Sequence, residues 1–191
     1  MVTTNSKELS DKKHAGYLLG EKLIEHKNGS TVIISTSRES SATAFYLAEK
    51  LSVSWAVICC EEIVHPANAA KTIGSVSLDE IVMHDDAFIP RDFIGRQIQL
   101  LQHKIKSHNN FFSTLTGTHD LKYKQVIVVC DYLQNCDRIL ATIKSIKKQN
   151  PLKTIVASIN VAPEPARLIA STVDKIVFLK MTHSPEARLH F

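Results

Sequence analysis

The feature that most constrains the fold is Val126-Ile127-Val128-Val129, a run of four consecutive β-branched apolar residues. A strand that is apolar at every position has both faces buried, which is typical of a parallel sheet covered by helices on both sides. Other β-rich runs and helical patterns alternate along the chain. The β-rich runs are 31–36, 53–60, 154–160 and 175–179, and the helical patterns are 9–26, 42–51, 136–149 and 163–171. This alternation predicts an α/β protein with a central, mainly parallel sheet.

The middle of the chain departs from this alternation. Two short β-rich runs, 72–76 and 80–83, predict a hairpin. Pro90 is placed to begin a helix that continues to about Lys106. The segments 64–70 and 107–119 are polar or contain turn residues, and we expect both to be loops.

The composition indicates one globular domain spanning residues 1–191, with 44% hydrophobic and 22% charged residues. The polar start and the lack of a long apolar run predict a cytoplasmic protein with no membrane partner. The net charge of +4 is spread evenly. It is compatible with anionic ligands but predicts no nucleic-acid partner. Cys59, Cys60, Cys130 and Cys136 contain no CxxC pair, so we expect buried reduced thiols and no metal.

Several short motifs follow one another along the chain. They are DKKHAG at 11–16, VIISTSRES at 32–40, IVHPAN at 63–68, IGSV at 73–76, DLKYK at 120–124, VAP at 161–163 and DKIV at 174–177. Their order and spacing resemble the type I phosphoribosyltransferases, in particular a bacterial subgroup of that family. The resemblance covers residues 11–179. It implies a phosphoribosyltransferase type I-like fold with helices on both faces of the sheet, and a small hood built partly from the termini and residues 62–86. The site is then expected at the carboxyl ends of the strands, above Asp131.

The motif that binds phosphoribosyl pyrophosphate (PRPP) in this family is altered here. In the family, two acids after the core strand contact the ribose hydroxyls, and a G-I-A-T-G-A-T loop holds the 5′-phosphate. Cys130 replaces the first acid, and Asp131 keeps the second. The loop glycines and threonines are replaced by Tyr132, Asn135, Cys136 and Arg138. Tyr132 obstructs close backbone approach, and Asp137 adds an anion at the helix start, so the PRPP motif is degenerate.

The positions that face pyrophosphate in the family have also changed. Arg38 is kept, but Glu39-Ser40 replaces two glycines, and Glu61-Glu62 replaces an Arg-Lys pair. At a separation of about 4 Å with surface-like screening, each charge reversal costs a few kcal/mol of attraction to an anionic substrate.

Each candidate residue also has a structural interpretation. Asp131 either contacts ribose or caps the next helix. Arg38 either holds an anion or pairs with a nearby carboxylate, for which Glu39, Glu61 and Glu62 are available. Glu61 and Glu62 are expected at the rim of a loop rather than as a catalytic pair, because neighbours on a strand point apart. His84-Asp85-Asp86 is a weak metal candidate.

Three functions therefore stay open, and no catalytic residue is assigned. The favoured hypothesis is a phosphoribosyltransferase-like protein with degenerate phosphate loops that binds a ligand or a partner without catalysis. A phosphorylated small molecule is one such ligand. The second is an active transferase that uses Mg²⁺ and PRPP to modify a nucleobase or a related nucleophile. The third is a structural dimer module, since members of the family commonly form homo-oligomers.

Overall fold

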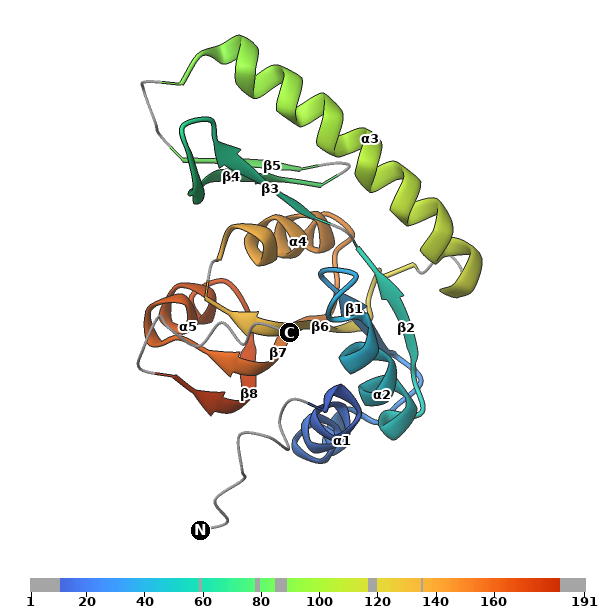
Figure 1. Ribbon diagram of the computed structural model, residues 1–191. Coiled ribbons are helices and arrows are strands. Elements are labelled where there is room, and N and C mark those ends of the chain that lie inside the picture. The colour runs from blue at the N-terminus through green and yellow to red at the C-terminus, as the bar shows by residue number, and fades with distance from the viewer. Residues whose placement is uncertain are drawn as a thin grey trace.

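The computed structural model describes residues 11–58, 60–77, 80–84, 89–116, 120–134 and 136–182. Five parallel strands form the main sheet in the order β2-β1-β6-β7-β8 (Figure 1). The strands are β1 (Thr31–Ser35), β2 (Ser54–Val57), β6 (Gln125–Leu133), β7 (Lys153–Val161) and β8 (Lys175–Met181). This sheet confirms the predicted α/β fold.

Helices cover both faces of the main sheet. The helices α1 (Lys12–Lys22) and α2 (Ser41–Leu51) lie on one face, and α4 (Asp137–Lys147) and α5 (Pro163–Ala170) lie on the other (Figure 1). In the central strand β6, Ile127 and Val129 belong to the core under α1 and α2, whereas Val126 and Val128 belong to the core under α4. The two-residue period of a strand explains this division and the uninterrupted apolar run.

The helices α1 and α2 approach each other closely at two glycines. A Cβ atom added at Gly16 would lie 2.7 Å from Tyr46 Cβ and 2.8 Å from the Thr43 carbonyl oxygen. At Gly20 it would lie 2.5 Å from Lys50 Cγ. Lys12, Gly16 and Gly20 are four residues apart and share one face of α1. The close contact therefore brings Lys12 against the start of α2, beside the carboxyl ends of β1 and β6.

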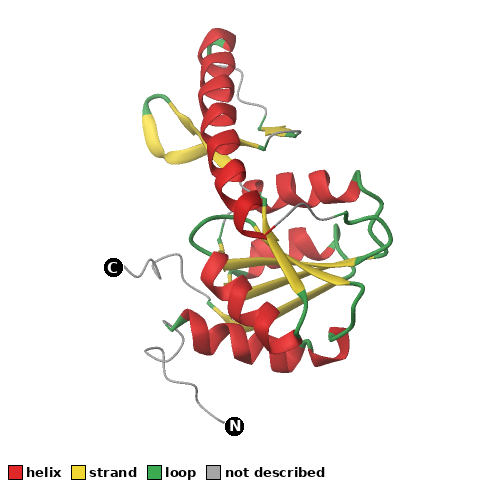
Figure 2. Ribbon diagram, turned by 90° about the vertical axis from the view of Figure 1, so that its right-hand side faces the viewer, coloured by secondary structure: helices red, strands yellow, loops and turns green. Residues whose placement is uncertain are grey.

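A second, antiparallel sheet forms the hood, in the order β3-β4-β5. Its strands are β3 (Glu61–His65), β4 (Asn68–Val76) and β5 (Ile81–Met83). The long helix α3 (Arg91–Thr116) packs on it through a core that includes Ile63, Ile73 and Ile105. Figure 2 shows α3 and the small sheet standing beyond the main sheet. None of the described helices is long and apolar enough to cross a membrane.

The hairpin predicted at 72–83 is confirmed, but three neighbouring predictions are wrong. Residues 64–70 form the end of β3, a turn and the start of β4, because Pro66 occupies the turn between them rather than a longer loop. Residues 107–116 continue α3, since this stretch contains no proline or glycine to end a helix. The strand expected at 53–60 ends at Val57.

The expected contribution of the termini to the hood concerns residues 1–10 and 183–191, which lie outside the described residues. The first described helix, α1, packs on α2 and on the main sheet rather than in the hood. It does so because Leu19 and Leu23 are fully buried in the core under α1 and α2.

Candidate functional site

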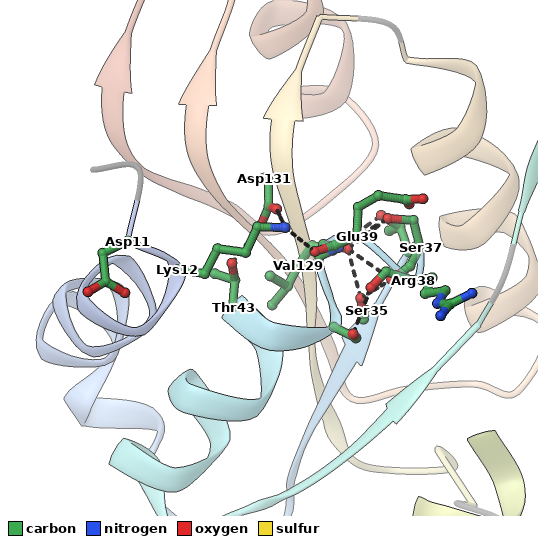
Figure 3. A network of polar contacts seen from close by, with 12 residues as sticks. Asp11, Lys12, Ser35, Ser37, Arg38, Glu39, Thr43, Val129 and Asp131 are labelled. Carbon is green, nitrogen blue, oxygen red and sulfur yellow. Dashed lines mark hydrogen bonds and ion pairs between the residues drawn. The ribbon is translucent and has the colours of Figure 1, made fainter. Parts of the chain in front are cut away.

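Asp131 lies at the carboxyl end of β6 with both carboxylate oxygens engaged by other parts of the chain (Figure 3). Its Oδ1 accepts a hydrogen bond from Thr43 Oγ1 at 2.7 Å, and its Oδ2 lies 3.0 Å from Lys12 Nζ. The side chain is only 7% exposed. The alternation of β6 directs Asp131 toward α2, and α4 has no side-chain cap, so of the two alternatives for Asp131 the helix cap is wrong.

Lys12 joins three elements at this point. Its ammonium contacts Asp131 on β6 and donates to the carbonyl oxygen of Glu39 in the loop between β1 and α2 (Figure 3). Asp11 caps α1 by accepting a hydrogen bond from the Lys13 amide at 2.9 Å, which fixes the start of the helix. Lys12 was not among the predicted site residues. The signal that could have found it is its place in the 11–16 motif.

The loop between β1 and α2 satisfies its own polar groups. Ser35 Oγ donates to the Ser37 carbonyl oxygen at 2.7 Å and lies 2.7 Å from Ser40 Oγ. The Ser40 amide in turn donates to Ser37 Oγ at 3.2 Å. These contacts turn the hydroxyl groups toward one another rather than outward.

Glu39 carries a negative charge in this loop. Burial raises its pKa, but hydrogen bonds from its own amide and from Ser37, with the charges of Arg138 and Lys12, lower the pKa below 4.5 overall. Arg38 is exposed, and its guanidinium points away from Asp131 (Figure 3). No ion pair joins Arg38 to Glu39, Glu61 or Glu62, so the expected pairing is not formed by these described residues. The Arg38 guanidinium is therefore accessible to an anionic ligand from solvent.

The amino terminus of α4 is closed by the hood. Asp137, the first residue of α4, is 6% exposed, and its Oδ1 lies 2.7 Å from His84 Nε2. Ser75 on β4 donates to the Asp137 carbonyl oxygen at 2.7 Å. A carboxylate interacts favourably with the positive end of a helix dipole. Asp137 thus occupies the kind of position in which the resembling family holds a phosphate.

The weak metal candidate at 84–86 gains no support. His84 contacts Asp137, whereas Asp85 and Asp86 lie outside the described residues, as does the candidate Asn135. Within the described part of the chain, no group of three His, Cys, Asp or Glu side chains is arranged to hold a metal ion.

Glu61 and Glu62 begin β3 in the hood, so their expected position on a loop rim is wrong. Glu61 Oε1 lies 2.9 Å from Lys104 Nζ on α3, and Glu62 Oε1 lies 3.8 Å from Arg138 Nη2 on α4. Two acids after an apolar run predicted the end of a strand, whereas Glu61 and Glu62 are the first residues of the next one. Both acids therefore link the hood to neighbouring helices.

Tyr132 and the cysteines complete the set of predicted residues. Tyr132 is 42% exposed at the end of β6, opposite Asn160 of β7. Cys60, Cys130 and Cys136 are free and buried, which confirms the expected buried thiols for these three, while Cys59 lies outside the described residues. Burial raises the pKa of Cys130 to about 12 and that of Cys136 to about 11. Neither thiol is suited to act as a nucleophile at neutral pH.

Solved structures share this fold at low sequence identity. TT1426 from Thermus thermophilus is 19% identical with a TM-score of 0.74, over 91% of this chain and 85% of that one. A purine phosphoribosyltransferase from Pyrococcus horikoshii is 18% identical with a TM-score of 0.53, over 94% and 86%. A hypoxanthine-guanine phosphoribosyltransferase from Bacillus anthracis is 13% identical with a TM-score of 0.56, over 96% and 84%.

These likenesses establish the fold, which is that of the type I phosphoribosyltransferases. No protein-family model matches the sequence, and no curated protein matches it either.

Proposed function

We propose that this protein is a divergent member of the phosphoribosyltransferase family that binds a ligand or a partner without catalysing transfer. The observation that carries the proposal is the state of Asp131. This residue matches the one acid of the PRPP motif that the chain keeps, and its two oxygens are already bound by Thr43 and Lys12. A ribose hydroxyl has to displace one of these contacts to reach the carboxylate.

The charges around Asp131 support the same conclusion. Asp137 is held at the start of α4 by His84, and Glu39 is charged beside Lys12. A 5′-phosphate at α4 would meet the Asp137 carboxylate within a partly desolvated site, where repulsion between like charges is strong. A pyrophosphate at the loop between β1 and α2 would meet Glu39.

The arginines near Asp131 that are not tightly paired with a carboxylate favour a ligand of low charge. Arg38 is exposed in this loop, and Arg138 lies 3.8 Å from Glu62 and within reach of the Glu39 charge. A small molecule with one phosphate or carboxylate group matches two arginines better than PRPP, which carries a phosphate and a pyrophosphate.

An active transferase that uses Mg²⁺ and PRPP is the second candidate. The fold and the location of Asp131 at the carboxyl end of β6 favour it. The Lys12 side chain is 41% exposed and is attached to a flexible stem, so substrate binding is able to displace it. Self-association into a dimer is compatible with either candidate and is likewise a proposal.

Calorimetric titration with PRPP and Mg²⁺ separates the two candidates. Wild-type protein is compared with Asp131→Ala and Lys12→Ala, and Lys13→Ala is the matched control because Lys13 faces the Tyr46 ring instead. We expect no saturable heat from the wild type. Binding gained by Lys12→Ala alone identifies the Lys12 contact as the block. Micromolar binding by the wild type that is lost in Asp131→Ala refutes the proposal and favours the transferase.

A further inference from the structure

The fold gathers lysines at the amino ends of the parallel strands. The helices α1, α2 and α4 run from the carboxyl ends of the strands to the amino ends, and each finishes with a lysine that complements the helix dipole. The segments that enter the strands carry further lysines. We name this surface the amino-edge face, and its lysines are Lys22, Lys27, Lys50, Lys122, Lys124, Lys147, Lys148, Lys153 and Lys175.

The carboxylates of the amino-edge face are already engaged. Glu25 lies 2.7 Å from Lys175 Nζ, and Glu21 lies 3.6 Å from Lys50 Nζ. Asp120 and Asp174 accept hydrogen bonds from backbone amides, those of Lys122 and Thr154. Among the described residues, no carboxylate forms an ion pair with any of four lysines on this face. These are Lys27, Lys122, Lys124 and Lys147.

An exposed aromatic side chain lies among these free cations. Tyr123 is 69% exposed, and Lys122 Nζ lies 5.1 Å from the centre of its ring. The Tyr123 amide donates to the Asn150 carbonyl oxygen at 3.1 Å, and the Leu152 amide donates to the Lys124 carbonyl oxygen at 2.9 Å. These two bonds tie the turns before β6 and β7 together and hold the ring beside the lysines.

Tyr123 carries a bulky side chain on a left-handed backbone. Tyr123 has φ of 58° and Asn150 has φ of 51°, both in the left-handed region. Asparagine tolerates this region, whereas a bulky residue there is uncommon and carries a local strain. Glycine or asparagine at position 123 would make the turn more stable than tyrosine does, so the stability of the turn does not account for the exposed ring.

We propose that the amino-edge face binds single-stranded nucleic acid. The free lysines would contact phosphates, and the Tyr123 ring would stack on a base, which is how strand-binding surfaces combine charge with aromatic groups. An anionic membrane surface would attract the same lysines. It fits less well, because the exposed apolar side chains there, Ile24 and Leu152, are few and separated in the chain.

This proposal departs from the expectation drawn from the sequence. The charge is even along the chain, but the parallel topology brings helix ends and strand entries to one edge. The amino-edge face lies at the opposite end of the strands from Asp131, so the proposal is independent of the function proposed for that site.

Fluorescence anisotropy tests the proposal with the full chain and a labelled oligothymidylate of about 20 nucleotides at low and high salt. We expect saturable binding that weakens as salt rises. The double variant Lys122→Ala/Lys124→Ala should reduce the slope of log affinity against log salt by about 1.4, because a lysine–phosphate contact to a single strand contributes about 0.7. Arg91→Ala, at the start of α3 in the hood, is the charge control and should leave the slope unchanged.

Tyr123→Asn tests the stacking contact separately. Asparagine accepts the left-handed backbone, so the variant should fold at least as well as the wild type, which thermal unfolding checks. We expect about a tenfold loss of affinity with an unchanged salt slope. Asn150→Gly, in the adjoining turn, keeps the ring and should bind normally. Absence of binding at low salt, an unchanged slope in the lysine variant, or binding to anionic vesicles without binding to the oligonucleotide each overturns the proposal.

Discussion

Replacing Gly16 by alanine tests whether the close contact between α1 and α2 positions Lys12. The added Cβ would lie 2.7 Å from Tyr46 Cβ and 2.8 Å from the Thr43 carbonyl oxygen. Neither atom is the end of a flexible side chain, so α1 has to move outward. Overpacking of this kind costs about 1–3 kcal/mol. Alanine returns about 1 kcal/mol of helix propensity, so the expected net loss of unfolding free energy is about 0–2 kcal/mol relative to the wild type.

A second close glycine and an open one provide comparisons. At Gly20 the added Cβ would lie 2.5 Å from Lys50 Cγ and 2.8 Å from Lys50 Cβ, neither of which is the far end of the side chain, so Gly20→Ala should destabilise the contact between α1 and α2 as Gly16→Ala does. At Gly95 on α3 no atom lies within 4 Å, so alanine should stabilise the protein by up to about 1 kcal/mol. The predicted order of stability therefore places Gly95→Ala above both Gly16→Ala and Gly20→Ala.

Urea unfolding monitored by circular dichroism and by the fluorescence of Trp55, the one tryptophan of the chain, measures these differences. A loss of 1 kcal/mol corresponds to a fall in Tm of about 2–4 °C for a chain of this size. If Gly16→Ala is as stable as Gly95→Ala, α1 does not depend on a close contact at this position. The placement of Lys12 would then need another explanation.

Three further predictions concern Lys12, the buried thiols and Glu39. Lys12→Met leaves the Asp131 carboxylate with one partner and should lower the unfolding free energy by about 1 kcal/mol. Lys27→Met is the control and should leave the unfolding free energy unchanged. Equal effects of the two substitutions would contradict a stabilising ion pair between Lys12 and Asp131. Burial raises the pKa of Cys130 to about 12, so Cys130 should resist iodoacetamide at pH 7 until the protein unfolds. Peptide mapping by mass spectrometry measures the labelling. Rapid labelling of Cys130 in the native protein would contradict its burial. The pKa of Glu39 lies below 4.5, so its stabilising effect is present above that pH and is lost as the pH falls through the lowered value. Glu39→Gln should therefore flatten the fall of Tm between neutral pH and about pH 3, and an unchanged profile refutes this.

Much of the fold was predictable because strand and helix patterns are local. The apolar run at 126–129 required a strand with two buried faces, and it is the central strand of the main sheet. The failures occurred where local pattern and tertiary structure disagree. Polar residues at 107–116 form the end of a long helix, because nothing in that stretch ends it. Residues 61–70 belong to a small sheet and its turn, and the buried side of this sheet shares a core with α3.

The candidate site was predictable only in part. Asp131 could be located, since it follows the core strand and the two-residue period sets its direction. Its partners could not, because Thr43 and Lys12 are distant from Asp131 in sequence and reach it only through the packing of α2 on the sheet and of α1 on α2. The same holds for His84, which meets Asp137 across the contact between the hood and α4.

The layered α/β architecture and the identity of the groups at the carboxyl end of β6 follow from local pattern, because hydrophobic period and strand alternation are properties of neighbouring residues. The electrostatic character of each end of the sheet depends instead on how the helices pack. The packing joins Lys12 to Asp131 and His84 to Asp137 at one end, and it gathers free lysines around Tyr123 at the other. The physical reason is that Coulombic and hydrogen-bond energies depend on distance in space, and helix packing sets that distance for residues far apart in the chain.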